Sequence, residues 1–185
     1  ASNTPSLMLN LATRKIIDVK PPLRDAKKKS KTKQIGILAT SSAIKSNGLT
    51  QYIKKNNLTN SFKIFKINGS ELVELVESGK FLTNKKLCQK IIKKTLDLIL
   101  VKNSIDTITL SSTHLSFLKS LLKKEYPMIN FIDPSNIIAE KVFVKIKNIQ
   151  SKRNSLNIYA SGNTKSFQKK LNKIGIKNKI NFLSV

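Results

Sequence analysis

The sequence predicts an α/β protein with parallel, doubly wound sheets, and two observations lead to this expectation. Short runs of apolar and β-branched residues alternate with longer segments whose apolar residues recur at helical spacing. The connections between the short runs are long enough to hold a helix, and they lack the turn signals that are typical of hairpins. Parallel strands need such crossover connections, so repeated βαβ units are expected. A chain of 185 residues can bury a sizeable core as one or two small domains.

Each expected strand is a short apolar run that stops at a cluster of small polar residues. The expected strands span 34–39, 61–67, 107–110, 128–132 and 156–160. Amphipathic helices are expected between and around them, because apolar residues recur there every three or four positions. The expected helices span 7–17, 43–53, 71–77, 84–101, 115–125, 136–148 and 164–174.

Proline, glycine and lysine mark the ends of several of these elements. Pro21-Pro22 ends the first helix, and Gly79 closes the helix over 71–77. The stretch 27–33, which is crowded with lysines, is interpreted as a solvated helix end or connection and as a domain boundary. Cys88 falls in the interior of an expected helix, where we expect it to be buried packing.

The chain is strongly basic, because 35 Lys and Arg outweigh 10 Asp and Glu and leave a formal net charge of +25. No acidic residue follows Glu140, whereas eleven Lys or Arg do. Such a field attracts nucleic acid or an anionic membrane without reading any sequence. Lysines that cover solvated helix faces explain the same composition, and the scattered tyrosines form no RNP-like cluster. Nucleic acid is therefore an allowed but disfavoured partner.

The apolar runs and the cysteine content bear on the location of the protein. No apolar run reaches the roughly 18 residues that a membrane-spanning helix needs, so no membrane partner is expected. The single cysteine excludes an internal disulfide framework and suits a reducing compartment. We therefore expect a cytoplasmic protein.

The segment after the third expected strand is the strongest candidate for a site. The strand breaks abruptly into Ser111, Ser112, Thr113 and His114, the only histidine of the chain. In an open α/β sheet such a loop lies at the carboxyl edge, where ligands bind and the N–H groups of helices point outward. Thr113 and His114 are therefore expected at a site for a carboxylate or a phosphate.

Several other kinds of site are excluded by what the sequence lacks. Neither G-x-G-x-x-G nor G-x-x-x-x-G-K-[ST] occurs, so no nucleotide fingerprint is present. One histidine with scattered carboxylates does not make a metal site. No G-x-S-x-G motif and no placed carboxylate completes a hydrolase triad. We expect no metal and no cofactor.

Six fragments, in order along the whole chain, resemble the glutamate racemase family of the aspartate/glutamate racemase superfamily. Among them, ASNTPS resembles the family's A-C-N-T-A-S, LSSTH resembles L-G-C-T-H, and IGILATSSAIKS resembles G-V-I-G-T-x-A-T-I-K-S. LVESG, FIDP and IYASGN are similar to the L-V-E-x-G, L-I-D-P and Y-T-T-G-D segments. The fragments lie at 1–6, 35–46, 75–79, 110–114, 131–134 and 158–163, the last followed by Phe167.

The resemblance implies two α/β lobes with flavodoxin-like, doubly wound parallel sheets and a substrate bound between them. Residues 27–135 would form one complete lobe, and residues 1–26 and 136–185 would be parts of the other. The opening strands of that other lobe carry the family's contacts to the substrate amine and side-chain carboxylate. They would be missing here, so the chain would lack the N-terminal part of the family fold.

The resemblance also implies a cofactor-independent amino-acid racemase, an isomerase that interconverts L- and D-glutamate or aspartate and serves cell-wall biosynthesis. Its partners would be a small amino-acid or dicarboxylate ligand and a second copy in a homodimer. The family mechanism needs two thiols on opposite faces of the substrate Cα, one to remove a proton and one to return it. Ser2 and Ser112 occupy both thiol positions here. A serine hydroxyl ionises far less readily than a thiol, so both acid/base positions are lost as written.

The remaining site residues follow from the same resemblance, position by position. Asn3, Thr4 and Thr113 match residues that hold the α-carboxylate, Thr40 matches a pocket threonine, and His114 and Glu77 match residues that assist the second thiol. Three of these have a purely structural alternative. His114 would cap its own helix, Glu77 would lie on a solvated helix edge with Glu71 and Glu74, and Thr40 would only cap a helix.

Two explanations fit the serines. They are natural, which makes the chain a degenerate or repurposed binder of an amino acid or a dicarboxylate, or they are engineered to trap a substrate complex. A basic-surface protein that binds nucleic acid is the alternative from a different functional class.

Overall fold

The computed structural model of the protein describes residues 3–8, 17–57, 61–147 and 155–184. Contacts between residues divide the chain into two compact units, 1–145 and 146–185. Within the described residues, none of the helices is both long enough and apolar enough to cross a membrane.

The first unit is built on a four-stranded sheet in which every neighbouring pair of strands is parallel. The strand order is β2-β1-β3-β4, so β1 and β3 lie at the centre. This order is that of a flavodoxin-like, doubly wound sheet, and the expected α/β fold with parallel strands is confirmed. The strands are β1 (Gln34–Ala39), β2 (Lys63–Asn68), β3 (Thr107–Leu110) and β4 (Asn130–Ile132).

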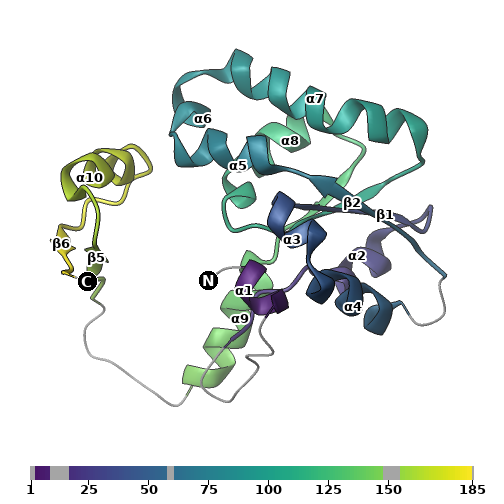
Figure 1. Ribbon diagram of the computed structural model, residues 1–185, viewed down its shortest axis with the longest axis horizontal. Helices are drawn as coiled ribbons and strands as arrows, with labels where there is room; N and C mark the ends of the chain where they lie inside the picture. Colours follow the sequence, from purple (N-terminus) through teal and green to yellow (C-terminus); the bar gives the residue numbers. More distant parts are fainter. Residues whose placement is uncertain (1–2, 9–16, 58–60, 148–154, 185) are drawn as a thin grey trace. The chain divides into compact units, whose positions relative to one another are not determined.

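Helices cover both faces of this sheet, as Figure 1 shows. Alternate residues of β1 point to opposite faces, so Ile35 and Ile37 pack into one hydrophobic cluster and Leu38 into the other. A strand buried on both faces needs apolar residues on both, which explains the continuous apolar run that predicted it. The first cluster takes side chains from α1 (Asn3–Met8), α2 (Leu23–Lys29), α3 (Ser41–Lys45) and α4 (Asn47–Asn56). The second takes them from α5 (Ser70–Glu77), α7 (Lys85–Lys102), the 3₁₀ helix η1 (Leu115–Leu118) and α8 (Lys119–Glu125).

The described part of the first unit contains two further helices. The short α6 (Lys80–Thr83) follows Gly79, which adopts a left-handed φ of 75° and closes α5 as expected. The helix α9 (Ser135–Ile146) follows β4 and has no buried residue.

The described part of the second unit contains a two-stranded parallel sheet and one helix. Strand β5 (Ile158–Ala160) pairs in register with β6 (Ile180–Phe182), and α10 (Thr164–Lys173) forms the crossover between them. Asn163 caps α10, because its side-chain oxygen accepts a hydrogen bond from the N–H of Ser166 at 2.9 Å.

The structure corrects several expected elements. The expected helix over 43–53 is two helices, because Ser46 accepts the N–H of Leu49 and caps a new helix there. The helix expected from residue 115 begins as the 3₁₀ turn η1. The expected helix over 7–17 lies largely outside the described residues. The helix end expected in the stretch 27–33 is the last turn of α2, whose start at Leu23 was not expected, and α6 and β6 had no counterpart among the expected elements.

Candidate functional site

The candidate site lies where the two central strands of the sheet end. β1 leads to β2 on one side and β3 leads to β4 on the other, so the strand order reverses between β1 and β3. Ligands of open α/β sheets bind outside the carboxyl ends of the strands at such a switch point. Leu38 and Leu110 are register partners, and the N–H of Ser111 donates to the carbonyl of Leu38 at 2.8 Å. The loops after β1 and β3 therefore leave the sheet side by side.

The loop after β1 is held by a short chain of hydroxyl contacts. Thr40 is the N-cap of α3, and its Oγ1 accepts the N–H of Ala43 at 3.4 Å and lies 3.1 Å from Oγ of Ser42. The N–H of Ser41 donates to Oγ of Ser70 at 2.9 Å, which ties this loop to the loop after β2. Thr40 thus has the capping role foreseen as its structural alternative, and it has that role at the carboxyl edge of β1.

The loop after β3 is more deeply placed than its polar composition suggests. Ser112 is only 8 % exposed, and its carbonyl accepts the N–H of Leu115 at 3.1 Å. Oγ of Ser111 lies 2.9 Å from Oγ1 of Thr109, so the first hydroxyl of the loop is turned into the protein. Thr113 and His114 follow at the partly exposed rim, where a ligand has access to them.

His114 reaches across to the helix that follows β2. Its Nε2 lies 3.6 Å from Oε1 of Glu77 on α5, which makes an ion pair when the imidazole is protonated. The His114 side chain makes no capping hydrogen bond to η1. Its side chain is 39 % exposed and that of Glu77 is 58 % exposed, so water screens this pair. The two residues that the family resemblance joined therefore do meet, at a partly solvated edge.

Asp133, which follows β4, is a positioning residue that the sequence reasoning did not single out. Its Oδ1 accepts hydrogen bonds from Oγ of Ser116 at 2.9 Å and from Oγ of Ser135 at 2.6 Å. Burial acts to raise the pKa of Asp133, but the hydrogen bonds from Ser135 and Ser116 outweigh it and the pKa is lowered. The carboxylate therefore fixes η1, and with it the loop that carries Thr113 and His114. In the sequence, the FIDP fragment at 131–134, which contains Asp133, is the signal that could have identified this residue.

Three of the expected site residues, Ser2, Asn3 and Thr4, are near the start of the sequence, where the structure describes few side chains. Ser2 lies outside the described residues. Asn3 and Thr4 belong to α1, which packs beside α3 and α4, and their side chains are outside what the structure describes. The backbone of α1 thus lies next to the helix that starts immediately after Thr40.

The described side chains contain no group of three or more His, Cys, Asp or Glu residues able to hold a metal ion. Cys88 lies on α7 with no exposed surface, as expected for a packing residue, and burial raises the pKa of its thiol.

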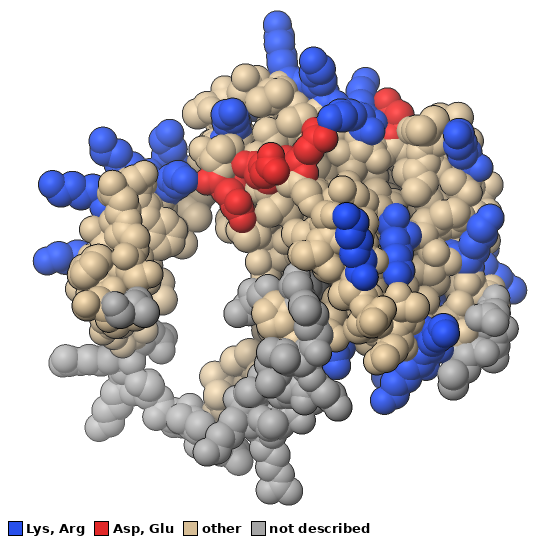
Figure 2. Space-filling view, viewed as in Figure 1, with Lys and Arg blue, Asp and Glu red and all other residues tan. Residues whose placement is uncertain are grey.

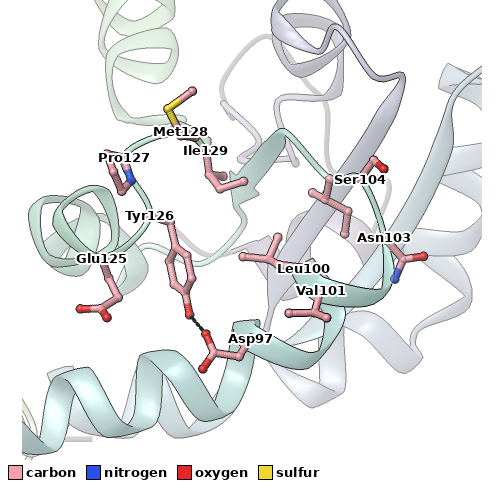
Figure 3. A pocket seen from close by; sticks show the side chains of 11 residues that line it. Asp97, Leu100, Val101, Asn103, Ser104, Glu125, Tyr126, Pro127, Met128 and Ile129 are labelled. Carbon is pink, nitrogen blue, oxygen red and sulfur yellow. Dashed lines mark hydrogen bonds between the residues drawn. The ribbon is translucent and has the colours of Figure 1, made fainter.

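A separate hollow of about 440 Å³ lies at the opposite edge of the same sheet (Figure 3). Its walls include residues 103–105, just before β3, and residues 127–129, just before β4. Tyr126 closes one side, with its hydroxyl donating to Oδ1 of Asp97 at 2.5 Å. Burial, together with this bond, raises the pKa of Tyr126. This hollow is at the amino edge and is distinct from the candidate site.

Lys and Arg are spread over one face of the molecule rather than gathered in a single patch. Figure 2 shows them around most of that face, with most of its acidic side chains in one group and another set apart among lysines at the upper right. A solvated lysine coat of this kind is a weak signal for a specific anionic partner.

Comparison with known proteins points to one family, although no family model matches the chain. Glutamate racemase of Sulfurihydrogenibium sp. is 36 % identical over 149 residues, which are 80 % of this chain and 52 % of the relative. Glutamate racemase of Persephonella marina is 32 % identical over 176 residues, covering 91 % of this chain and 65 % of the relative.

A solved structure of similar fold comes from the same family. The Escherichia coli glutamate racemase, in complex with L-glutamate and the activator UDP-MurNAc-ala, superposes with a TM-score of 0.75. It is 21 % identical and covers 91 % of this chain, which spans 65 % of it. The chain thus spans between about half and two thirds of these relatives. Over that span, with its parallel sheet and its six ordered fragments, the chain belongs to the glutamate racemase family.

Proposed function

We propose that this chain binds a small amino dicarboxylate, of the glutamate or aspartate class, in the loops after β1 and β3. The observation that carries the proposal is the meeting of these two loops at the switch point of the sheet. Membership of the glutamate racemase family gives the ligand class, and the E. coli relative was solved with L-glutamate bound.

The side chains at this edge suit the α-carboxylate of such a ligand. Thr113 offers a hydroxyl donor, and His114, whose ring lies 3.6 Å from Glu77, offers a ring N–H donor. Thr40 adds a second hydroxyl on the facing loop. Asn3 and Thr4 are proposed to contribute from α1, as the resemblance implies.

We infer that the chain binds this ligand without moving its α-proton. Serine occupies both positions where the family has a thiol, Ser2 and Ser112. A hydroxyl without a strong activating base is a poor base toward a carbon acid, whereas a thiolate is an adequate one. Ser112 is nearly buried, and the His114 ring lies against Glu77 on the neighbouring helix. Cys88 is too deeply buried to replace either thiol.

Exchange of the glutamate α-proton with D₂O tests this proposal. The chain is expected to leave the α-proton signal of L- and D-glutamate and of aspartate intact. The Ser2→Cys, Ser112→Cys variant, fused at its N-terminus to the segment of the Sulfurihydrogenibium relative that this chain does not match, is expected to exchange it. Exchange by the unaltered chain would refute the loss of proton transfer, and an inert double-cysteine fusion would refute the racemase-type pocket.

The lobe arrangement, location and assembly are part of the same proposal. All four strands of the main sheet lie inside residues 27–135, in keeping with one complete lobe there, with residues 1–26 and 136–185 as parts of the other. We propose a cytoplasmic protein that needs no cofactor and forms a homodimer, and the single, buried cysteine suits that compartment.

Binding of nucleic acid by the basic surface is the second candidate. The net charge of +25 and the absence of acidic residues after Glu140 favour it. The dispersed lysines in Figure 2 and the lack of an aromatic cluster weigh against a dedicated module. A salt titration of single-stranded DNA binding separates the two cases.

A further inference from the structure

The hollow at the amino edge of the main sheet differs in charge from the rest of this basic chain (Figure 3). Its walls include Asp97 and Glu125, and among the described residues that line it there is no Lys or Arg. The chain as a whole has 35 Lys and Arg against 10 Asp and Glu, so this wall departs from the composition of the protein. By contrast, a second hollow of about 580 Å³ beside α2 has lysines and an arginine in its wall. The hollow of Figure 3 therefore favours a positively charged ligand.

Of the two carboxylates, Asp97 is the one that is open to a ligand. Its Oδ1 accepts the hydroxyl of Tyr126, and a carboxylate has two oxygens with capacity for several hydrogen bonds. Oε1 of Glu125 pairs with Nζ of Lys93 at 2.9 Å, and the Glu125 side chain is only 16 % exposed. Asp97 is exposed on the last turns of α7, and the bond from Tyr126 holds its carboxylate in a defined position.

Two helices end at this hollow. α7 ends at Lys102 and α8 ends at Glu125, and the C-terminal end of a helix carries a partial negative charge. The lysines in these last turns are directed elsewhere. Lys102 is not among the lining residues, and Nζ of Lys123 donates to the carbonyl of Pro127 at 2.8 Å. The two helix ends thus add to the attraction that Asp97 exerts on a cation.

The rest of the hollow is apolar and has the size of a small-molecule site. Leu100, Ile105 and Ile129 are buried or half-buried in its wall, and Val101 and Met128 are 85 % and 86 % exposed. Sites for small ligands are concave, measure roughly 300–1,000 Å³, and combine a mainly apolar lining with a few polar groups that fix the orientation. At about 440 Å³, with one open carboxylate, this hollow fits that description.

We propose that the hollow binds a small organic cation, in which a protonated amine is attached to an aromatic or aliphatic body. The ammonium group donates to the carboxylate of Asp97, and the body covers Leu100, Val101 and Ile129. The apolar contact supplies most of the affinity and the carboxylate supplies the selectivity for charge, because an exposed ion pair contributes little by itself. The inference does not depend on the dicarboxylate proposed above, whose loops lie at the opposite edge of the sheet.

Other occupants suit the hollow less well. A dicarboxylate or a phosphate would be repelled by Asp97 and Glu125. A lysine of a peptide carries the same ammonium group, but the volume of the hollow matches one small ligand rather than a run of side chains. The occupant is therefore a free small molecule.

A titration of the ¹⁵N-labelled full chain with 2-phenylethylammonium chloride tests the proposal. We expect saturable shifts of the backbone amides of Asp97, Val101 and Met128, and none at Thr40 or Thr113. Phenylacetate has a similar apolar body with the opposite charge and is expected to give no shift at the hollow. 2-Phenylethanol, which lacks the charge, is expected to bind about fivefold more weakly. Ammonium chloride is the blank for a cation without an apolar body.

An Asp97→Asn variant tests the role of the carboxylate. It is expected to bind 2-phenylethylammonium about fivefold more weakly, because the charge is removed. The amide oxygen of Asn can still accept the hydroxyl of Tyr126, so the circular dichroism of the chain should not change. The matched control is Glu71→Gln, which removes a carboxylate that pairs with Lys94 at 2.6 Å and does not line the hollow. This variant is expected to bind the cation as the unaltered chain does.

Three outcomes would overturn the proposal. The first is that 2-phenylethylammonium leaves the amides of the hollow unmoved. The second is that phenylacetate or 2-phenylethanol moves them with equal affinity, which would remove the selectivity for a cation. The third is that Asp97→Asn binds the cation as tightly as the unaltered chain does.

Discussion

At the scale of single residues, the most consequential position is Ser112. It lies at the carboxyl end of a central strand, 8 % exposed, in a loop whose neighbours suit a carboxylate ligand. In the proposed function this is a binding loop, and the hydroxyl is the wrong group for taking a proton from carbon. We infer that the loop keeps its ligand without the proton transfer that a thiol at this position would allow.

The accessibility of this position can be measured with a thiol in place of the hydroxyl. In a Ser112→Cys variant, we expect iodoacetamide to alkylate Cys at 112 well before Cys88, measured by mass spectrometry over time. Cys88 has no exposed surface, and burial raises the pKa of its thiol, so little reactive thiolate is available there. Cys88 serves as the internal control, and its labelling ahead of position 112 would contradict the described loop.

A second residue-scale prediction concerns Asp106, which precedes β3. Its carboxylate accepts hydrogen bonds from Oγ of Ser30 at 2.6 Å and from the N–H groups of Lys31 and Thr32 at 2.6 and 2.9 Å. Burial acts to raise the pKa of Asp106, yet these bonds outweigh it and hold the pKa below its ordinary 3.8. Asp106→Asn is expected to cost about 1–2 kcal/mol in the free energy of unfolding at pH 7.

The pH dependence of that loss follows from the direction of the pKa shift. The unfolded chain binds a proton at Asp106 more readily than the folded chain, so the stabilisation is complete above the ordinary pKa of 3.8. It is lost as the pH falls through the lower pKa of the folded state. Urea unfolding at several pH values should show the difference between the unaltered chain and Asp106→Asn shrinking in acid. The exposed Glu140→Gln is the control, and an equal loss there would count against the account.

At the scale of elements, strands and helices were easiest to predict from the sequence where their apolar residues follow a regular pattern. The apolar runs of β1 and β3 could be recognised because both faces of these strands are buried. The long helix α7 could be recognised because its apolar residues recur at helical spacing along one face. β6 escaped recognition because its neighbours are Lys and Asn and only Ile180 is buried. The break between α3 and α4 depends on the cap at Ser46, which apolar spacing does not reveal.

The candidate site was predictable in part, for a similar reason. The loop after β3 could be recognised from the abrupt change from β-branched to hydroxyl residues, whereas Thr40 was expected at the site only because of the family resemblance. The pairing of His114 with Glu77 followed only from the family resemblance, because contacts between distant segments are not encoded in local spacing. The role of Asp133 in fixing η1 likewise depends on the meeting of two loops in space.

Close packing at the centre of the sheet gives a prediction for Gly36. A Cβ added there would lie 2.8 Å from Cδ1 of Ile67 and 3.1 Å from Cγ1 of Ile108. Gly36→Ala is therefore expected to lower the free energy of unfolding by about 1–3 kcal/mol, measured by urea denaturation.

Removal of the obstructing methyl group should reverse part of that loss. Ile67→Val deletes Cδ1, so the Gly36→Ala, Ile67→Val double variant should be more stable than the sum of the single effects predicts. Gly162→Ala, whose Cβ would meet no atom within 4 Å, is the control and should have little effect. Strict additivity of the two substitutions would contradict the described contact.

At the scale of the whole molecule, the charge of +25 sets the behaviour toward polyanions. We expect single-stranded DNA to bind at low ionic strength without sequence preference. The affinity should fall steeply with salt and be weak at about 0.15 M, because the attraction comes from dispersed lysines. Fluorescence anisotropy against salt concentration measures this. Tight binding at that salt, with a preferred sequence, would favour the nucleic-acid function instead.

The proposed function depends on the loops at the switch point holding an amino dicarboxylate. The most direct test is a titration of the ¹⁵N-labelled chain with L-glutamate, followed by the amide resonances of the protein. The account predicts saturable shifts at Thr40, Thr113 and His114, reduced in a Thr113→Val variant and absent when γ-aminobutyrate, which lacks the α-carboxylate, replaces glutamate. Resonances at these three residues that stay unmoved, while shifts spread over the lysine-rich surface, would contradict it.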